Sequence, residues 1–281
     1  FPTTTGGELK LANLVSIASS SADNVWFDAA DNSVISAPLL TTLANASVKL
    51  SGNHQFTPGV VTDIDNSAIS VTAGAQFGAS EITAESFANT TFAGGIQFHA
   101  DGAGSLLDLS SLLQYEDTLS NGATRTVLAI NNGVVDLSNL NAATRTGNST
   151  LEFRASGGGE IKLDRLTTVV SDSANNFVVS VADGSTIAAP MLTTLSNVSL
   201  VLSGNHQFTS GVLTDIDDGT ISLSGGAQFG TTEIAATAFT NATFAGGNQF
   251  SADGAGSLLD LSSLLQYEDT LSNGAARTVL A

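Results

Sequence analysis

Two pairs of aspartates could contribute oxygen ligands to a divalent cation. Asp63 and Asp65 are separated by one residue, and so are Asp215 and Asp217. In an extended segment, residues i and i+2 point to the same face, so both carboxylates of a pair are presented together. Ca²⁺ takes about 6–8 oxygen ligands, and one pair supplies part of such a shell. These four aspartates are therefore the predicted calcium ligands, and a solvated acidic turn is the alternative interpretation.

Adjacent acidic residues suggest a second kind of chemistry, the hydrolysis of glycosidic bonds. Glu116-Asp117 and Glu268-Asp269 each follow a Gln-Tyr pair, and two carboxyl groups can cleave a glycosidic bond when they flank it. Neighbouring residues of a strand point to opposite faces, so such a pair can flank one sugar only if it lies in a turn. Basic partners are scarce, with 8 Lys and Arg in 281 residues. The sequence therefore predicts no catalytic residue and a chain that is not an enzyme.

The spacing of the three histidines does not indicate a metal site or a catalytic triad. His54 and His206 occupy equivalent positions of a repeat, and the equivalent of His99 is Ser251. At the strand spacing of a stacked repeat, His54 and His206 would lie about 30 Å apart, too far to share an ion. We therefore interpret the histidines as turn or surface residues, and expect no cofactor apart from the calcium predicted above.

The elements that position these residues belong to a long tandem repeat. Residues 100–123 read ADGAGSLLDLSSLLQYEDTLSNGA, and the same letters recur at residues 252–275. The chain thus contains one unit, residues 1–152, and an incomplete second unit, residues 153–281. Because both ends fall inside a repeat, we expect the segment to belong to a longer chain. We expect residues 1–281 to fold as one continuous solenoid.

A shorter period of 21 to 29 residues lies inside the long unit. A Gln-Phe pair recurs at 21-residue spacing, which predicts a column of phenylalanines beside a ladder of hydrogen-bonded amides. The pairs are Gln55-Phe56, Gln76-Phe77 and Gln97-Phe98 in the first unit, and Gln207-Phe208, Gln228-Phe229 and Gln249-Phe250 in the second. A second predicted column contains Leu50, Val71 and Phe92. These spacings give about six coils per long unit, with coil lengths typical of solenoid repeats.

A pair of apolar residues three positions apart marks nearly every coil. The pairs are Leu11/Leu14, Leu40/Leu43, Val61/Ile64, Leu109/Leu112, Leu137/Leu140, Leu163/Leu166, Leu192/Leu195, Leu213/Ile216 and Leu261/Leu264. Other segments alternate between apolar and polar residues, as in Val48-Lys49-Leu50 and Ile69-Ser70-Val71, which is typical of half-buried strands. Turn signals such as Asn132-Gly133 separate the strands.

The predicted fold is therefore all-β. We expect a β-solenoid, namely a parallel β-helix of the usual right-handed sense, with about three short strands per coil. About eleven coils at the strand spacing would form a rod about 50 Å long. A leucine-rich-repeat solenoid competes with this prediction because LxxL recurs at a similar length, but its asparagine signature is missing. A short helix over residues 110–116 is a further alternative.

Composition excludes several kinds of partner. The net charge is −18, so no basic stripe exists to neutralise the phosphates of a nucleic acid, and attraction to an anionic membrane is not expected. No apolar stretch is long enough to insert into a membrane. The chain has no cysteine, which removes disulfides and thiolate chemistry.

The coils, the Gly/Asn/Asp turns, the lack of cysteine and the near-identical long repeats resemble the β-helical shafts of large bacterial surface exoproteins. These include autotransporter passengers, filamentous-haemagglutinin-like proteins and giant repetitive adhesins. The resemblance implies an extracellular or cell-surface location and a structural role as a fibre or adhesin shaft. It implies self-association along or between fibres, with surface glycans as further partners. A polysaccharide-active β-helix enzyme and a glycan-binding module are the alternatives.

Overall fold

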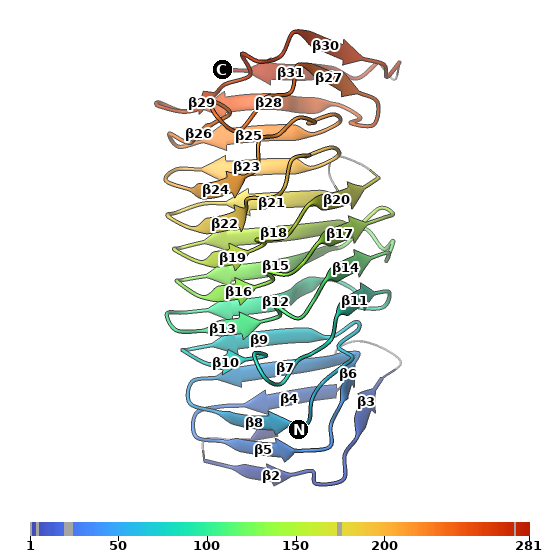
Figure 1. Ribbon diagram of the computed structural model, residues 1–281, viewed down its shortest axis with the longest axis vertical. Helices are drawn as coiled ribbons and strands as arrows, with labels where there is room; N and C mark the ends of the chain where they lie inside the picture. Colours follow the sequence, from blue (N-terminus) through green and yellow to red (C-terminus); the bar gives the residue numbers. More distant parts are fainter. Residues whose placement is uncertain (1, 4–5, 20–24, 173–175, 273) are drawn as a thin grey trace.

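The computed structural model describes residues 2–3, 6–19, 25–172, 176–272 and 274–281. Short parallel strands wind into coils that stack along one long axis (Figure 1). The described residues contain no helix, and accordingly no helix that could cross a membrane. The prediction of an all-β fold built as a parallel β-solenoid is confirmed.

One face of the solenoid is a single parallel sheet of twelve strands. In spatial order the strands are β1 (Pro2–Thr3), β4 (Val25–Ala29), β7 (Ala46–Ser51), β9 (Ala68–Thr72), β12 (Gly95–Asp101), β15 (Thr124–Ile130), β18 (Thr150–Ser156), β21 (Phe177–Val181), β23 (Ser199–Ser203), β25 (Thr220–Ser224), β28 (Gly247–Asp253) and β31 (Arg277–Leu280). We call this the main sheet. Its order follows the sequence, so each coil is hydrogen-bonded to the coils before and after it.

Shorter strands form the second and third faces. The second face contains β2 (Glu8–Lys10), β5 (Val34–Ala37), β8 (Gln55–Pro58), β10 (Gln76–Phe77), β13 (Leu106–Asp108), β16 (Val134–Asp136), β19 (Glu160–Lys162), β22 (Thr186–Ala189), β24 (Gln207–Ser210), β26 (Gln228–Phe229) and β29 (Leu258–Leu259). The third face contains β3 (Ser16–Ala18), β6 (Thr42–Ala44), β11 (Ser86–Asn89), β14 (Gln114–Asp117), β17 (Ala142–Arg145), β20 (Thr168–Ser171), β27 (Ala238–Asn241) and β30 (Gln266–Asp269). A complete coil therefore has three strands.

Coil lengths follow from one column of register partners on the main sheet. The column is Pro2, Asp28, Lys49, Ser70, His99, Leu128, Arg154, Ser180, Val201, Ser222, Ser251 and Leu280. Successive members are 26, 21, 21, 29, 29 and 26 residues apart, and then 26, 21, 21, 29 and 29. The order of coil lengths thus repeats after six coils, and all of them lie in the predicted range.

The apolar pairs form the corner between the second and third faces. Leu109 and Leu112 are both fully buried, and the amide of Leu112 donates a hydrogen bond of 3.0 Å to the carbonyl of Leu109. The same turn occurs at Leu137/Leu140 and at Leu163/Leu166. The turn lets both leucines point inward while the two residues between them face outward. The predicted pair per coil is therefore a corner that anchors the chain to the core.

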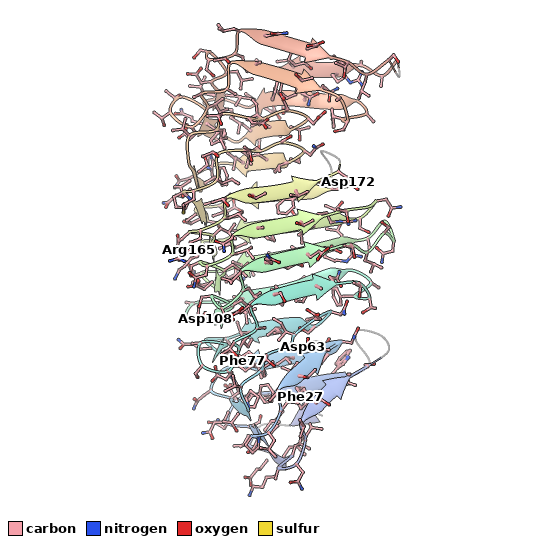
Figure 2. The ribbon with its side chains drawn as sticks, turned by 45° about the vertical axis from the view of Figure 1, so that its right-hand side comes forward. Phe27, Asp63, Phe77, Asp108, Arg165 and Asp172 are labelled. Atoms are coloured by element: carbon pink, nitrogen blue, oxygen red, sulfur yellow. The ribbon has the colours of Figure 1, made fainter. Side chains whose placement is uncertain are left out.

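The predicted phenylalanine column is correct over two coils and wrong at the third. The ring centroids of Phe56 and Phe77 lie 5.5 Å apart on neighbouring coils. The ring of Phe27, on the main sheet, stacks on that of Phe56 at 5.3 Å. Figure 2 labels Phe27 and Phe77. Phe98 instead belongs to the main sheet, where its register partner is Ile69. The constant 21-residue spacing fails because the coil after residue 70 has 29 residues.

Two other predictions are wrong at the same coil. The register partner of Val71 is Ala100 rather than Phe92, so the Leu50 column continues with alanine. Gln97 does not lie in the predicted amide ladder, because a β-bulge between Ile96 and Phe98 turns its side chain inward. Gln97 is fully buried, and its amide donates to the carbonyl of Ser67 at 3.2 Å.

The short helix considered over residues 110–116 is also wrong. Residues 114–117 form strand β14, which pairs with β11 on one side and β17 on the other. Tyr115 and Asp117 are buried while Gln114 and Glu116 are exposed. This two-residue alternation fits a strand and does not fit the 3.6-residue period of a helix.

Tight contact between coils makes some glycines irreplaceable. Gly78 has φ +115°, and a Cβ atom there would lie 1.9 Å from the carbonyl oxygen of Asp108 in the next coil. Gly95 has a similar φ of +105° but open space around it. Both positions disfavour an L side chain, so only the steric contact distinguishes them.

We predict that Gly78→Ala lowers the free energy of unfolding by about 1–3 kcal/mol more than Gly95→Ala, because the added methyl group forces two coils apart. Urea denaturation of the two variants measures the difference. Equal losses would show that the coils do not approach each other at Gly78.

Candidate functional site

The predicted calcium ligands lie at the third face, where Asp65 and Asp217 hold one coil to the next. Asp63 Oδ1 accepts a hydrogen bond from the amide of Asp65 at 3.0 Å. Asp65 Oδ1 accepts one from the amide of Ala88, one coil further along, at 2.8 Å. In the second unit, Asp215 Oδ1 accepts from the amide of Asp217 at 2.9 Å, and Asp217 Oδ1 accepts from that of Thr240 at 2.6 Å.

These hydrogen bonds give each aspartate pair a structural role. Burial raises the pKa of Asp65, and the charge of Asp63 adds to the shift while the amide of Ala88 opposes it. Asp217 has a raised pKa for the same main reason. Within the described ranges, no group of three or more His, Asp or Glu side chains is placed to hold a metal ion. Calcium binding stays a prediction, which thermal melting with and without calcium would decide.

The adjacent acids Glu116 and Asp117 point to opposite faces of β14. Glu116 is exposed, whereas Asp117 is fully buried inside the coil. The two carboxyl groups therefore do not face one common ligand. The inward one belongs to a buried polar cluster that the sequence analysis missed.

The buried cluster is centred on Asp117. Its Oδ2 atom lies 3.3 Å from Nη1 of Arg125 and 3.8 Å from Nε of Arg145. Its Oδ1 atom accepts a hydrogen bond of 3.2 Å from the side-chain amide of Asn89. Asn89, Asp117 and Arg145 are register partners on β11, β14 and β17, and the side chains of Asp117, Arg125 and Arg145 have no exposed surface.

The two guanidinium groups also fix the loops that lead back to the main sheet. Arg145 donates to the carbonyls of Asp117, Leu119 and Ser149 at 3.0, 3.1 and 2.9 Å. Arg125 donates to the carbonyl of Phe92 at 3.0 Å and to Asn121 Oδ1 at 2.9 Å. The carbonyls of Phe92, Leu119 and Ser149 lie outside the strands, and the guanidinium groups satisfy them.

Two opposing effects act on the pKa of the Asp117 carboxyl. Burial raises the pKa of the Asp117 carboxyl, while the charges of Arg125 and Arg145 oppose that shift. In the second unit, Asp269 and Arg277 occupy the positions of Asp117 and Arg125, with Nη1 and Oδ2 3.0 Å apart. The ion pair of the cluster, together with the Asn241–Asp269 hydrogen bond, therefore recurs with the long repeat.

A sequence signal for this cluster exists. Arg125 alternates with Val127 and Ala129, which marks it as an inward position of its strand. Asn89, Asp117 and Arg145 are spaced by 28 residues, close to one long coil. Alternation combined with coil length would have placed all of them inside the solenoid.

The histidines occupy surface and turn positions, as interpreted from the sequence. His99 lies on the outer side of β12, where its Nδ1 is 3.0 Å from Ser70 Oγ. His54 and His206 lie in the equivalent turns of the two units, beside Gly52 and Phe208. Burial lowers the pKa of all three side chains.

Comparison of this chain with protein-family models, with curated proteins and with solved structures gives no match. The fold itself defines the class, which is a parallel β-solenoid with tandem long repeats. The function is therefore argued from this chain's own geometry.

We predict that Arg125→Met lowers the free energy of unfolding by about 3–5 kcal/mol, because it leaves the buried Asp117 carboxylate with one cation fewer. Lys162→Met is the control, since Lys162 pairs at 3.2 Å with Asp136 where both side chains are partly exposed. Its expected cost is below about 1 kcal/mol. Urea denaturation monitored by circular dichroism compares them, and similar losses would contradict the structural role of the cluster.

We predict that stability falls as the pH decreases below the ordinary histidine pKa of 6.5. The folded chain holds His99 with a lowered pKa, so the unfolded chain binds the proton first and acid favours unfolding. His99→Ser introduces the residue that the second unit carries at Ser251. The variant should lose less stability than the parent between pH 7.5 and 5.5. An unchanged pH dependence in thermal melts would refute the contribution of His99.

Proposed function

We propose that this chain is a structural shaft of an extracellular fibre or adhesin, in which the number of coils sets the length. The observation that carries the proposal is the unbroken register column from Pro2 to Leu280, in which the coil lengths of the first unit recur in the same order in the second. When each repeat pairs in register with the next, every added repeat lengthens the rod and leaves its cross-section unchanged.

The contacts between coils suit a load-bearing rod. Backbone hydrogen bonds of all three faces run along the axis, so each coil satisfies the polar groups of its neighbours. The paired leucines fill the interior, and the Asp117 cluster ties loops of successive coils together. A force along the axis would have to break many of these backbone hydrogen bonds at the same time.

The surface is consistent with a location outside the cell. The net charge of −18 favours a solvated, mutually repelling rod, and a fold without cysteine does not depend on redox conditions. The resemblance of the sequence pattern to bacterial surface shafts supports the same location. We further propose that the role is mechanical rather than catalytic, because the acidic pairs hold coils together instead of converging on a ligand.

Insertion of one additional 152-residue unit into the full chain tests the shaft proposal. Six added coils should lengthen the particle by about 29 Å at constant diameter, given the strand spacing. Small-angle scattering and negative-stain microscopy measure both dimensions. A second compact particle, or an unchanged length, would contradict the proposal.

A further inference from the structure

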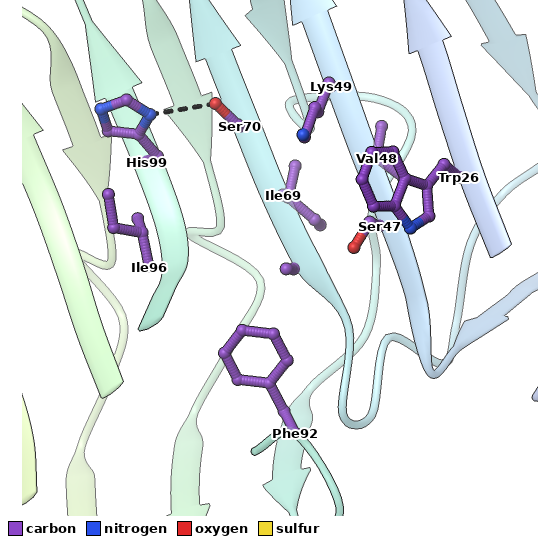
Figure 3. A pocket seen from close by; sticks show the side chains of 10 residues that line it. Trp26, Ser47, Val48, Lys49, Ile69, Ser70, Phe92, Ile96 and His99 are labelled. Atoms are coloured by element: carbon purple, nitrogen blue, oxygen red, sulfur yellow. Dashed lines mark hydrogen bonds between the residues drawn. The ribbon is translucent and has the colours of Figure 1, made fainter. Parts of the chain in front are cut away.

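A groove lies on the outer side of the main sheet in the first unit. It crosses β4, β7, β9 and β12 and encloses a volume of about 300 Å³ (Figure 3). Trp26 borders one end and Ile96 the other, and these side chains are 46% and 47% exposed. The groove is therefore open to solvent and flanked by partly exposed apolar side chains.

Polar groups line the same groove. The Lys49 ammonium lies 4.3 Å from the centroid of the Trp26 ring. Ser70 Oγ and His99 Nδ1 are 3.0 Å apart and lie on the next two strands (Figure 3). Lys49, Ser70 and His99 are consecutive members of one register column, so a cation, a hydroxyl and an imidazole follow one another across the groove.

Lys49 differs from most of the few basic residues. Arg125 and Arg145 are buried with Asp117. Four other basic side chains, Lys10, Arg154, Lys162 and Arg277, form ion pairs with carboxylates. Lys49 and Arg165 form no ion pair with any described carboxylate, and of these two only Lys49 lies in the groove, where its ammonium sits over the indole ring. On a surface with a net charge of −18, this groove is thus a local site for an anion.

Asp28 limits how much negative charge the groove can accept. It is the register neighbour of Lys49 on β4. A densely sulfated or phosphorylated chain would meet repulsion from this carboxylate. A glycan with one carboxylate per sugar and apolar C–H faces fits the combination better.

The second unit has the same backbone without the groove's distinctive side chains. Val178, Val201, Asn248 and Ser251 stand at the positions of Trp26, Lys49, Ile96 and His99. The second unit has the same residue types at the positions of Ser70 and Phe92, namely Ser222 and Phe244. The exchange of four groove residues shows that the fold does not need them, which separates their role from that of the core.

We propose that this groove binds a uronic acid residue of an acidic glycan. Trp26 packs against the C–H face of one sugar, and Ile96, three strands away, contacts a neighbouring sugar of the same glycan, as aromatic and apolar side chains do in small-ligand sites. The Lys49 ammonium pairs with the carboxylate, and Ser70 and His99 form hydrogen bonds to hydroxyl groups. The proposal is independent of the shaft function, because a rod can be long with or without this site.

Isothermal titration of the full chain with trigalacturonic acid tests the site. We expect saturable binding with a dissociation constant below about 1 mM, a modest affinity for a small open site. The methyl ester of the same trisaccharide, which lacks the charge, should bind at least about 10-fold more weakly. Absence of binding, or equal binding of the ester, would overturn the proposal.

Variants taken from the second unit localise the binding. Trp26→Val and Lys49→Val should each weaken binding at least about 10-fold, and melting temperatures confirm that they fold. Arg165→Val is the control for general electrostatics, because Arg165 lies outside the groove and should leave the affinity unchanged. Full affinity in Lys49→Val, or an equal loss in Arg165→Val, would refute binding in the groove.

Discussion

Backbone hydrogen bonds between successive coils are the interaction on which the remaining structure depends. A strand of two to seven residues cannot hold its shape alone, and it becomes ordered because the strands on both sides satisfy its amide and carbonyl groups. Parallel register then decides which side chains stack. It places leucines over leucines at the corners, aspartate beside arginine in the interior, and lysine, serine and histidine across the outer groove.

The variable coil length is accommodated on the third face. In three of the four 21-residue coils this face is reduced to isolated bridges, such as the one between Val61 and Ile82, while the coil from Asp28 to Lys49 keeps the short strand β6. The 29-residue coils have full strands such as β11 and β14. The main sheet continues through both kinds of coil. Longer coils also contribute the inward Asp117 and the loops that Arg125 and Arg145 fix. Structural and recognition roles can therefore be placed on different faces of one rod.

Much of the fold could be predicted from the sequence, because its strongest signals are local. The alternation in Val48-Lys49-Leu50 and the paired leucines each depend on a few residues, and both were interpreted correctly. The register across coils of different length could not be derived from one spacing. Phe98 and Gln97 were misplaced because an extra eight residues in one coil and a β-bulge change which residues face inward. The Asp117 cluster was missed because charged residues are expected at the surface, although alternation marks Arg125 as buried.

Engineered disulfides in this cysteine-free chain test the register most directly. Ser222 and Ser251 are 29 residues apart in sequence, yet their hydroxyl oxygens are 3.0 Å apart on neighbouring coils. A Ser222→Cys/Ser251→Cys variant should form an intramolecular disulfide under mild oxidation, because neighbouring strands place the two residues within bonding range. A Ser222→Cys/Thr243→Cys variant, at the constant 21-residue spacing, should stay reduced. Ready oxidation of the second variant and none of the first would contradict the register from which the shaft, the buried cluster and the groove all follow.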